Sequence, residues 1–244
     1  MPCFESRLAR NSLPRDEAER WSPEQVLRWG FERFGRDIAI ASGFGAEGIV
    51  LIDIAARIKS DFRVFTLDTG FFFPETYALI EKVERRYGIR VERCRPALSP
   101  AEQARRYGEA LWTRQPDKCC AIRKVDPLKA KLVELSAWVA AIRREQTAAR
   151  ANAAKVEWDA KFDLVKLNPL ADWTHNQVWE YIRKHRVPHN PLHDRGYPSI
   201  GCTHCTRPVR IGEDLRAGRW SGFGKTECGL HTRSTSVERS HDSV

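Results

Sequence analysis

The fold is decided by the stretch Ile38-Ala-Ile-Ala-Ser42, together with the turn Gly43-Phe-Gly-Ala-Glu-Gly48 and the apolar run over residues 49–58 that follow it. The first stretch is a short apolar run of the kind found in buried strands. The glycines of the second mark a turn, and the apolar run beyond it is long enough for a helix. A strand, a glycine turn and a helix in this order predict one unit of an α/β sheet.

The same alternation continues along the chain. Residues 63–67 form the second predicted strand, and a helix over residues 75–87 follows it. A third strand is predicted over residues 90–94, and residues 137–142 and 162–167 are the fourth and fifth. Strands separated by helical crossovers predict a parallel twisted sheet with helices on both faces. In such sheets ligands bind at the carboxyl ends of the strands.

The residue composition of the sequence changes after Trp173. Thr174 is a good N-cap for a helix that runs to about His185, and prolines and glycines then break regular structure. We therefore predict three segments. They are a helical and partly disordered N-terminal segment (1–35), an α/β domain (36–206) and an irregular C-terminal tail (207–244), which has little apolar material to anchor it and is expected to be mobile.

The charge of the chain indicates an anionic partner. The chain has 244 residues, 42% hydrophobic and 30% charged, with a net charge of +9. This composition is typical of a globular protein that needs no cross-links. The charge suits nucleic acid on a basic face or a small anion in a basic cleft, and ordinary surface charge also accounts for it. Because no basic block is interleaved with aromatics, the small anion is favoured over nucleic acid.

The sequence also bears on the compartment. No apolar run approaches the length needed to cross a membrane, and the N-terminus lacks the apolar core of a secretory signal. We therefore expect a cytoplasmic protein that does not bind membranes. In a reducing compartment, clustered cysteines indicate metal binding or catalysis rather than a disulfide framework.

Two polar segments follow neighbouring predicted strands and would face one crevice. The first is the turn from Ser42 to Gly48, where close backbone approach and free helix amides suit an anion, although the turn is neither a P-loop nor a dinucleotide fingerprint. The second is Asp68-Thr69-Gly70. A third strand ends before Arg143-Arg-Glu-Gln146, with Arg150 beyond it. These arginines suit phosphate or sulfate oxygens, or they form surface ion pairs with Glu145.

Four cysteines make a complete ligand set for a metal centre. Cys119 and Cys120 are adjacent, and Cys202-Thr-His-Cys205 is a CxxC pair. Zinc and an iron–sulfur cluster both use such pairs. Adjacent residues on a helix point in different directions, so both bind one centre only if the centre is large or the backbone yields locally. This favours [4Fe–4S] over zinc. Lys124, one helical turn after Cys120, would lie beside the thiolates, contact an anionic substrate or face solvent.

Cys228 stands apart in Lys225-Thr-Glu-Cys-Gly-Leu-His231. Thiolate is the reactive form of cysteine, and positive groups such as Lys225 and His231 would lower the pKa of the thiol. Inert cysteines lie in apolar surroundings, whereas this one lies in a polar segment. A lone cysteine is more often inert than nucleophilic, so the residues alone leave both an inert and a reactive thiol open.

Together these motifs resemble the assimilatory iron–sulfur adenylyl-sulfate (APS) reductases, of the PAPS/APS reductase family, over about residues 38–231. The matching segments are Ser42-Gly-Phe-Gly-Ala-Glu47, Leu67-Asp-Thr-Gly70, Phe73-Pro-Glu-Thr-Tyr77, Cys119-Cys120 with Arg123-Lys124-Val125, Arg143-Arg-Glu-Gln146, Asn168-Pro-Leu-Ala-Asp-Trp173, Tyr197-Pro-Ser-Ile-Gly-Cys202-Thr-His-Cys205 and Lys225-Thr-Glu-Cys-Gly-Leu-His231.

The resemblance implies an adenine-nucleotide α-hydrolase-like fold, with a nucleotide- and cluster-binding domain and a catalytic tail. The residues that it assigns fall into three groups. They are the ligands of one [4Fe–4S] cluster (Cys119, Cys120, Cys202, Cys205), the catalytic residues (Cys228, Lys124, His231) and the substrate-binding residues (Ser42, Gly43, Gly45, Asp68, Thr69, Gly70, Arg144, Arg150, Arg216, Arg219).

The resemblance also implies a reaction. Cys228 would attack the sulfur of APS and carry it as an S-sulfocysteine, which a separate thioredoxin or glutaredoxin would resolve to sulfite. AMP would be the other product, and the pathway would be sulfate assimilation toward cysteine. No nucleic-acid partner is implied, and a homo-oligomer is expected.

Two departures and three alternatives remain at this stage. Ala140-Ala141 stands where family members often carry glycine, and Thr147-Ala148 replaces the usual Ser-Pro. The nearest alternative is a reductase of 3′-phosphoadenylyl sulfate (PAPS). A cluster-containing redox sensor and a zinc-bearing nucleic-acid binder come from different classes of protein.

Overall fold

Six strands form one sheet in the order β3-β2-β1-β4-β6-β5, in a computed structural model that describes residues 12–231. All neighbouring strands are parallel except β5 and β6, which are antiparallel. The predicted parallel sheet with helices on both faces is therefore confirmed, apart from one added edge strand. The strands are β1 Ile38–Ala41, β2 Arg63–Leu67, β3 Val91–Cys94, β4 Ala137–Ala140, β5 Val156–Asp159 and β6 Leu164–Leu167.

Strand β5 is absent from the sequence-based prediction because its four residues alternate too briefly to be recognised. It forms a tight hairpin with β6, in which Asp163 takes a positive φ of 60°. Asp is one of the few residues that adopt this conformation readily. The strand is therefore defined by its partner and by the turn rather than by its own pattern.

The helices begin where capping residues allow. Ser22 and Thr174 each accept a hydrogen bond from the backbone of the third helical residue, and the predicted N-cap at Thr174 is confirmed. Gly88 ends a helix in the left-handed conformation. The helices are α2 Arg15–Ala18, α3 Pro23–Phe34, α4 Ala46–Ile58, α5 Pro74–Tyr87, α6 Pro100–Tyr107, α7 Leu111–Arg114, α8 Pro116–Cys120, the π-helix η1 Ala121–Val125, α9 Asp126–Leu132 and α10 His175–His185, with short 3-10 turns η2 Arg144–Gln146, η3 Ala148–Arg150, η4 His193–Arg195 and η5 Thr203–Cys205.

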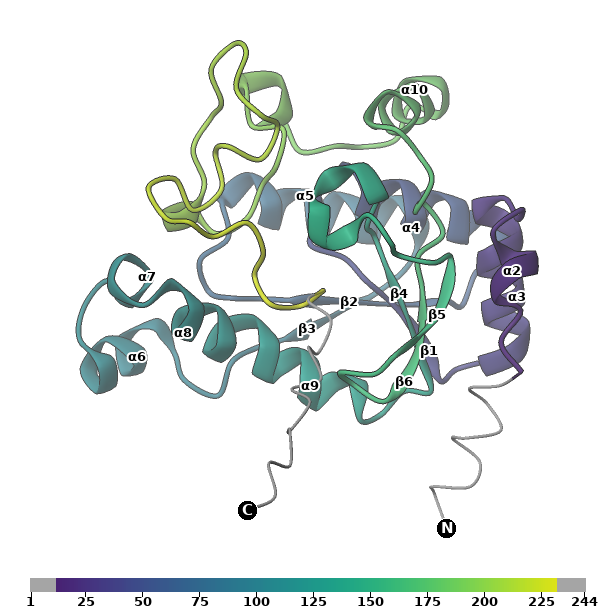
Figure 1. Cartoon of the computed structure of the whole chain (residues 1–244), viewed down its shortest axis with the longest axis horizontal. Coiled ribbons are helices and arrows are strands. Elements are labelled where there is room, and N and C mark those ends of the chain that lie inside the picture. The colour runs from purple at the N-terminus through teal and green to yellow at the C-terminus, as the bar shows by residue number, and fades with distance from the viewer. Residues whose placement is uncertain (1–11, 232–244) are drawn as a thin grey trace, which may run out of the picture.

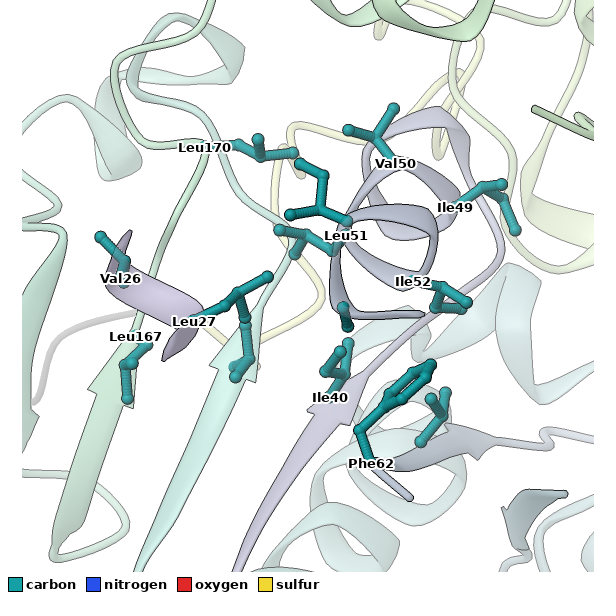
Figure 2. Packing of buried hydrophobic residues seen from close by; sticks show 14 of the residues in the cluster. Val26, Leu27, Ile40, Ile49, Val50, Leu51, Ile52, Phe62, Leu167 and Leu170 are labelled. Atoms are coloured by element: carbon teal, nitrogen blue, oxygen red, sulfur yellow. The ribbon is translucent and has the colours of Figure 1, made fainter. Parts of the chain in front are cut away.

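Two hydrophobic layers hold the helices on the sheet. Along β1, Ile38 and Ile40 point into the layer shared with α3, α4, α5 and α10, while Ala39 points into the layer shared with α9. Figure 2 shows Leu51 and Ile52 of α4 packed over Ile40. The helices of the two layers lie on opposite sides of the strands (Figure 1). Each such buried side chain contributes about 1.5–3 kcal/mol.

The N-terminal segment belongs partly to this core. Val26 and Leu27 of α3 are fully buried in the first layer. The predictions for residues 1–11 and 232–244 lie outside the described residues, and the three-segment division stays a prediction. Within residues 12–231, no helix combines the length and the apolar character that crossing a membrane requires.

The topology places a crevice at one end of the sheet. The chain moves outward from β1 through β2 to β3, and then returns to the other side of β1 at β4. Such a reversal leaves a crevice outside the carboxyl ends of the two central strands, where ligands bind in open α/β sheets. The ends of β1 and β4, at Ala41 and Ala140, are therefore the place to look for a site.

Candidate active site

A cavity of about 270 Å³ lies at this crevice. Ser42 and Gly43 line it after β1, and Ala140 and Ala141 line it after β4. The departure at Ala140-Ala141 thus falls on the cavity wall itself. The lining also includes the start of α4, Lys124, the loop after β4 and the C-terminal segment.

The turn between β1 and α4 is held in a tight conformation. Phe44 has a positive φ of 57°, and its backbone N–H donates to Ser42 Oγ over 3.1 Å. A Cβ on Gly48 would lie 2.5 Å from the same Oγ, so the first turn of α4 packs directly on Ser42. Gly45 is the N-cap of α4 and provides no side-chain cap, which leaves the helix amides available to an anion.

Lys124, Arg150, Arg216 and Arg219 line the same cavity, as does Arg143. Burial and the charges of Arg150 and Arg219 lower the pKa of Arg216 to about 10. Burial lowers the pKa of Lys124, but the neighbouring thiols of Cys202 and Cys228 outweigh it and raise that pKa overall. Within residues 12–231, Nε of Arg216 and Nε of Arg219 are buried without a hydrogen-bond partner. The cavity therefore offers excess positive charge and free donors to an anion.

The arginine pair after β4 divides its two side chains between different places. Arg143 lines the cavity, where its Nε donates to Glu47 over 2.9 Å and Gln146 also donates to Glu47. Burial raises the pKa of Glu47, but the charge of Arg143 outweighs it and lowers that pKa overall. Arg144 lies away from the cavity lining, donates to the carbonyl of Ala153 over 2.8 Å and forms an ion pair with Glu19. Arg143 is extended whereas Arg144 begins the 3-10 turn η2, and only Arg143 reaches the cavity.

Asp68-Thr69-Gly70 also lies outside the cavity lining. Asp68 accepts hydrogen bonds from Tyr77 and from Gly70 N, and this contact together with burial raises the pKa of Tyr77 to about 12. Thr69 Oγ1 lies 3.4 Å from Cys202 Sγ. The segment therefore supports a second, smaller cavity rather than the first.

The second cavity is lined by all four predicted ligand cysteines, Cys119, Cys120, Cys202 and Cys205. Arg123 is buried beside them and donates to Gln103, whose Nε2 lies 3.8 Å from Cys119 Sγ. An aromatic wall closes the cavity, with the ring of His204 stacked on Trp112 at 3.9 Å. Lys124 and Trp220 line both cavities, so the two sites share a wall.

The backbone changes its winding where the adjacent cysteines are presented. Helix α8 ends at Cys120, and residues Ala121–Val125 form a π-helix before α9 begins. A π-turn holds one extra residue and rotates the side chains before it relative to those after it; such turns are frequent at functional sites. The backbone therefore departs from a regular α-helix directly after Cys119 and Cys120, as binding of one centre by both cysteines would require.

The four cysteine side chains line one small cavity together. Among the described residues, no three His, Cys, Asp or Glu side chains are grouped as a single metal ion would need. A donor set of four sulfurs around one small cavity is what an iron–sulfur cluster uses. The residues present therefore fit a cluster better than one tetrahedral ion.

Cys228 lies in the first cavity. Its side chain is 9% exposed, lines the cavity and packs against Cys120 and Trp220. Three residues further, the ring of His231 lies parallel to that of Trp138 at 5.7 Å. Burial and the nearby charges of Arg150 and Lys166 hold the pKa of His231 well below its usual range, so the imidazole is neutral and adds no charge at neutral pH. The described part of the tail is thus docked in the site.

Comparison with known proteins identifies the relationship. The family profile described as the phosphoadenosine phosphosulfate reductase domain matches residues 37–208, which is most of the chain. The chain belongs to this reductase family. Two relatives, from Shouchella clausii and Halalkalibacterium halodurans, are named adenosine 5′-phosphosulfate reductase. They are 50% and 48% identical, over 84% and 87% of this chain and 86% and 93% of their own.

Solved structures give the same fold. A PAPS reductase from Candida auris in complex with phosphate matches with a TM-score of 0.68 and 30% identity, over 78% of this chain and 91% of that one. The FMN adenylyltransferase of Candida glabrata matches with a TM-score of 0.57 and 14% identity, over 91% of this chain and 75% of that one. The second likeness concerns the fold alone.

Within this reductase fold, the predicted residues fall into three sets. Lining the first cavity are Ser42, Gly43, Gly45, Lys124, Arg150, Arg216, Arg219, Cys228 and His231; lining the second are the four cysteines predicted as ligands; lining neither are Asp68, Thr69, Gly70 and Arg144.

Four residues in or beside the cavity have contacts that the sequence-based reasoning did not assign. Glu47 and Arg143 form an ion pair across the cavity wall, His193 has a buried Nε2 without a partner among the described residues, and Glu227 holds Arg150. The sequence contains a signal for Glu47, because an acidic residue in a glycine turn would need a cation. Nothing in the pattern around His193 distinguishes it from neighbouring loop residues.

Proposed function

We propose that the chain reduces APS to sulfite and AMP through a covalent intermediate on Cys228, in cytoplasmic sulfate assimilation. The observation that carries the proposal is that the buried free thiol of Cys228 and several cationic side chains line one cavity at the carboxyl ends of the central strands. The names of the relatives agree with this activity.

The proposed chemistry is the attack of the Cys228 thiolate on the phosphate–sulfate anhydride of APS. Cys228 Sγ attacks the sulfur atom of APS, a sulfur–sulfur bond forms and the bond from sulfur to the AMP oxygen breaks. AMP leaves with that electron pair, and the enzyme keeps a sulfonate on Cys228. A thiolate of thioredoxin or glutaredoxin then attacks Cys228 Sγ, sulfite leaves with the electrons of the sulfur–sulfur bond, and the second thiol of the partner resolves the mixed disulfide.

The cavity residues divide the work of binding and charge stabilisation. Lys124, Arg216 and Arg219 provide fixed cations for the phosphosulfate and for the departing phosphate, a role that requires donors already in place. The turn from Ser42 to Gly45 places backbone amides at the end of β1, where the adenylate would lie. His231 is neutral and can accept or hold a proton at Nδ1, which has no partner in the described chain.

The four cysteines of the second cavity would hold one [4Fe–4S] cluster. When bound, the cluster would supply a fixed local charge and cross-link two segments of the chain, while the two thiols of the partner protein provide both electrons and Cys228 is regenerated. Arg123 keeps a buried positive charge beside Cys119 and Cys202. Lys124 links the two cavities, because it lines both.

PAPS is the second candidate substrate, because the matching domain and the Candida auris structure bear that name. The test is sulfite release from APS and from PAPS with one thioredoxin, together with iron and acid-labile sulfide content. We expect APS to be preferred and iron and sulfide to be present in equal amounts. Zinc without iron, and no AMP release from APS, would refute both the reaction and the cluster.

A further inference from the structure

Glu227, the residue before the thiol, makes the most extensive side-chain contacts of the docked tail. Its carboxylate accepts from Nε and NH2 of Arg150, each over 2.7 Å, and from Thr147 Oγ1 over 2.8 Å. Arg150 and Glu227 are both buried, with side-chain exposures of 8% and 5%. A buried, bidentate arginine–carboxylate pair is the strongest and most directional kind of ion pair.

These contacts join the tail to the loop that follows β4. Thr147 and Arg150 belong to the turns η2 and η3, and Gln146 of the same loop accepts from Arg150 NH1. Arg150 is therefore held from both sides and has little freedom to move. Because Glu227 directly precedes Cys228, a Glu227 carboxylate held in place also restricts where the Cys228 thiol can lie.

The other anchors of residues 226–231 involve the backbone or the last described ring. Arg216 NH2 donates to Thr226 O over 3.0 Å, Lys161 donates to Gly229 O, and His231 stacks on Trp138. Glu227 is the only acidic residue between Lys225 and His231. From Thr226 to His231, the charge-specific part of docking therefore rests on this one side chain, and Lys225 adds an ion pair with Asp117 before it.

The charges of the cavity show that Glu227 does not take the place of a substrate. Its carboxylate occupies Arg150, and Lys124, Arg216 and Arg219 remain for an anion. Of these, Arg216 lies only 3.9 Å from Glu227 and keeps a buried Nε without a partner in the described chain. The docked carboxylate thus leaves Lys124 and Arg219 without an ion pair to Glu227 in the cavity.

We propose that Glu227 is a positioning residue that, through Arg150 and Thr147, docks the tail and places Cys228 in the substrate cavity. The effect on turnover rests on the function proposed above, whereas the effect on docking does not. A charge that loses its partner inside the protein is costly, so neutralising Glu227 releases the tail.

The test uses Glu227→Gln, which keeps the shape of the side chain and removes its charge. The matched control is Glu213→Gln, because Glu213 makes a similar two-point pair with Arg207 in the same segment but lines neither cavity. Docking is measured by hydrogen–deuterium exchange of the backbone amides of residues 226–231 and by iodoacetamide labelling of Cys228, read by peptide mass spectrometry. We expect both rates to rise by about tenfold in Glu227→Gln, as loss of one charge-assisted pair predicts, and to stay unchanged in the control.

Turnover provides the second readout. We expect kcat with APS to fall while KM stays within about twofold, the pattern of a lost catalytic orientation rather than lost binding. Glu227→Asp should recover part of kcat. Thr147→Val, which removes one hydrogen bond and leaves no unpaired charge, should shift exchange in the same direction and covers the case that Glu227→Gln does not fold.

Two results would overturn the proposal. One is unchanged exchange and labelling of residues 226–231 in folded Glu227→Gln and Thr147→Val. The other is a rise in KM alone, which would make Glu227 and Arg150 part of substrate binding. If wild-type protein showed docking that depends on Glu227 but no turnover of APS or PAPS, the positioning role would stand and the proposed function would fail.

Discussion

Lys124 and Trp220 are the residues through which the two cavities meet. Each lines both the first cavity, which contains Cys228, and the second cavity, which the other four cysteines line (the thiol cavity), and Cys120 and Cys228 pack together against Trp220. The residue types of both cavities were readable in the sequence, because cysteine pairs and a lone polar cysteine are distinctive. The direction of each side chain could not be read from the sequence. Arg143 and Arg144 are adjacent arginines that the sequence does not distinguish, yet only Arg143 lines the first cavity.

Replacing Cys228 with serine should separate the two groups of cysteines. Serine keeps the size of the side chain but is a far weaker nucleophile, so sulfite formation should fall by about a thousandfold or more. Iron and acid-labile sulfide per chain should stay at the wild-type level, since Cys228 is not among the four proposed ligands. Loss of iron in Cys228→Ser would contradict this division of roles.

Gly201 controls the position of Arg219. A Cβ at this position would meet the guanidinium, with Cζ only 2.6 Å away. Gly201→Ala should therefore displace Arg219 and raise KM for the substrate by about tenfold, the loss expected for one charge-assisted contact. Gly224→Ala is the matched control, because nothing lies within 4 Å of a Cβ there. An unchanged KM in Gly201→Ala would show that Arg219 does not contact the substrate.

At the scale of elements, the turn after β1 and the π-helix after α8 shape the two cavities. The turn could be predicted from its glycines, since they carry a specific conformational meaning. The π-helix could not, because its residues Ala121–Val125 are ordinary helix residues and their altered winding depends on what surrounds them. Helical periodicity in the sequence indicates that a helix is present and says nothing of one added residue in a turn.

The contact between Gly48 and Ser42 gives a prediction about the turn. Alanine in a helix interior is normally favoured over glycine by about 1 kcal/mol, yet its Cβ would lie 2.5 Å from Ser42 Oγ. Gly48→Ala should therefore destabilise the protein by about 1–3 kcal/mol, the usual cost of overpacking. In the double variant Ser42→Ala/Gly48→Ala the oxygen is gone, and most of the loss should be recovered. Denaturant unfolding of the four proteins gives the coupling, and additive effects would show that the two residues do not clash.

At the scale of the whole molecule, one buried carboxylate ties three helices together. Asp53 of α4 accepts hydrogen bonds from Tyr87 at the end of α5, from Tyr181 of α10 and from Arg57 of its own helix. Burial raises the pKa of Asp53, but the hydrogen bonds from Arg57 and the two tyrosines outweigh it and lower that pKa below 3.8. The folded protein therefore favours the ionised form more than the unfolded chain does.

Asp53→Asn should cost about 1–3 kcal/mol of unfolding free energy at neutral pH, since buried donors lose a charged acceptor. Because the pKa is lowered on folding, this contribution is present above the ordinary carboxyl pKa of 3.8 and is lost as pH falls through the lower folded value. The difference between wild type and variant should thus shrink below about pH 4. Denaturant titrations across this range test it, with Tyr87→Phe as a single-bond control; a difference independent of pH would exclude the ionised carboxylate as its source.

The layers of helices and sheet could be predicted from the sequence, because the hydrophobic residues of strands and of helices recur with different periods. What escaped prediction lies where long-range contacts decide. Strand β5 depends on β6, the ion pair of Glu47 joins residues far apart in the chain, and Asp68-Thr69-Gly70 supports the thiol cavity because Cys202 returns to it. Each of these features depends on a partner strand or residue that the local sequence pattern does not identify.

The two outermost strands bear on how copies of the chain can associate. Both β3, Val91-Glu-Arg-Cys94, and β5, Val156-Glu-Trp-Asp159, are short and carry charged residues. Such edges resist pairing with the strand of another molecule, because charges would have to leave water opposite one another. Continuation of the sheet from one copy into the next is therefore disfavoured, and an oligomer of this chain has to be built through helices or loops. The same feature protects heated or crowded protein from edge-to-edge aggregation.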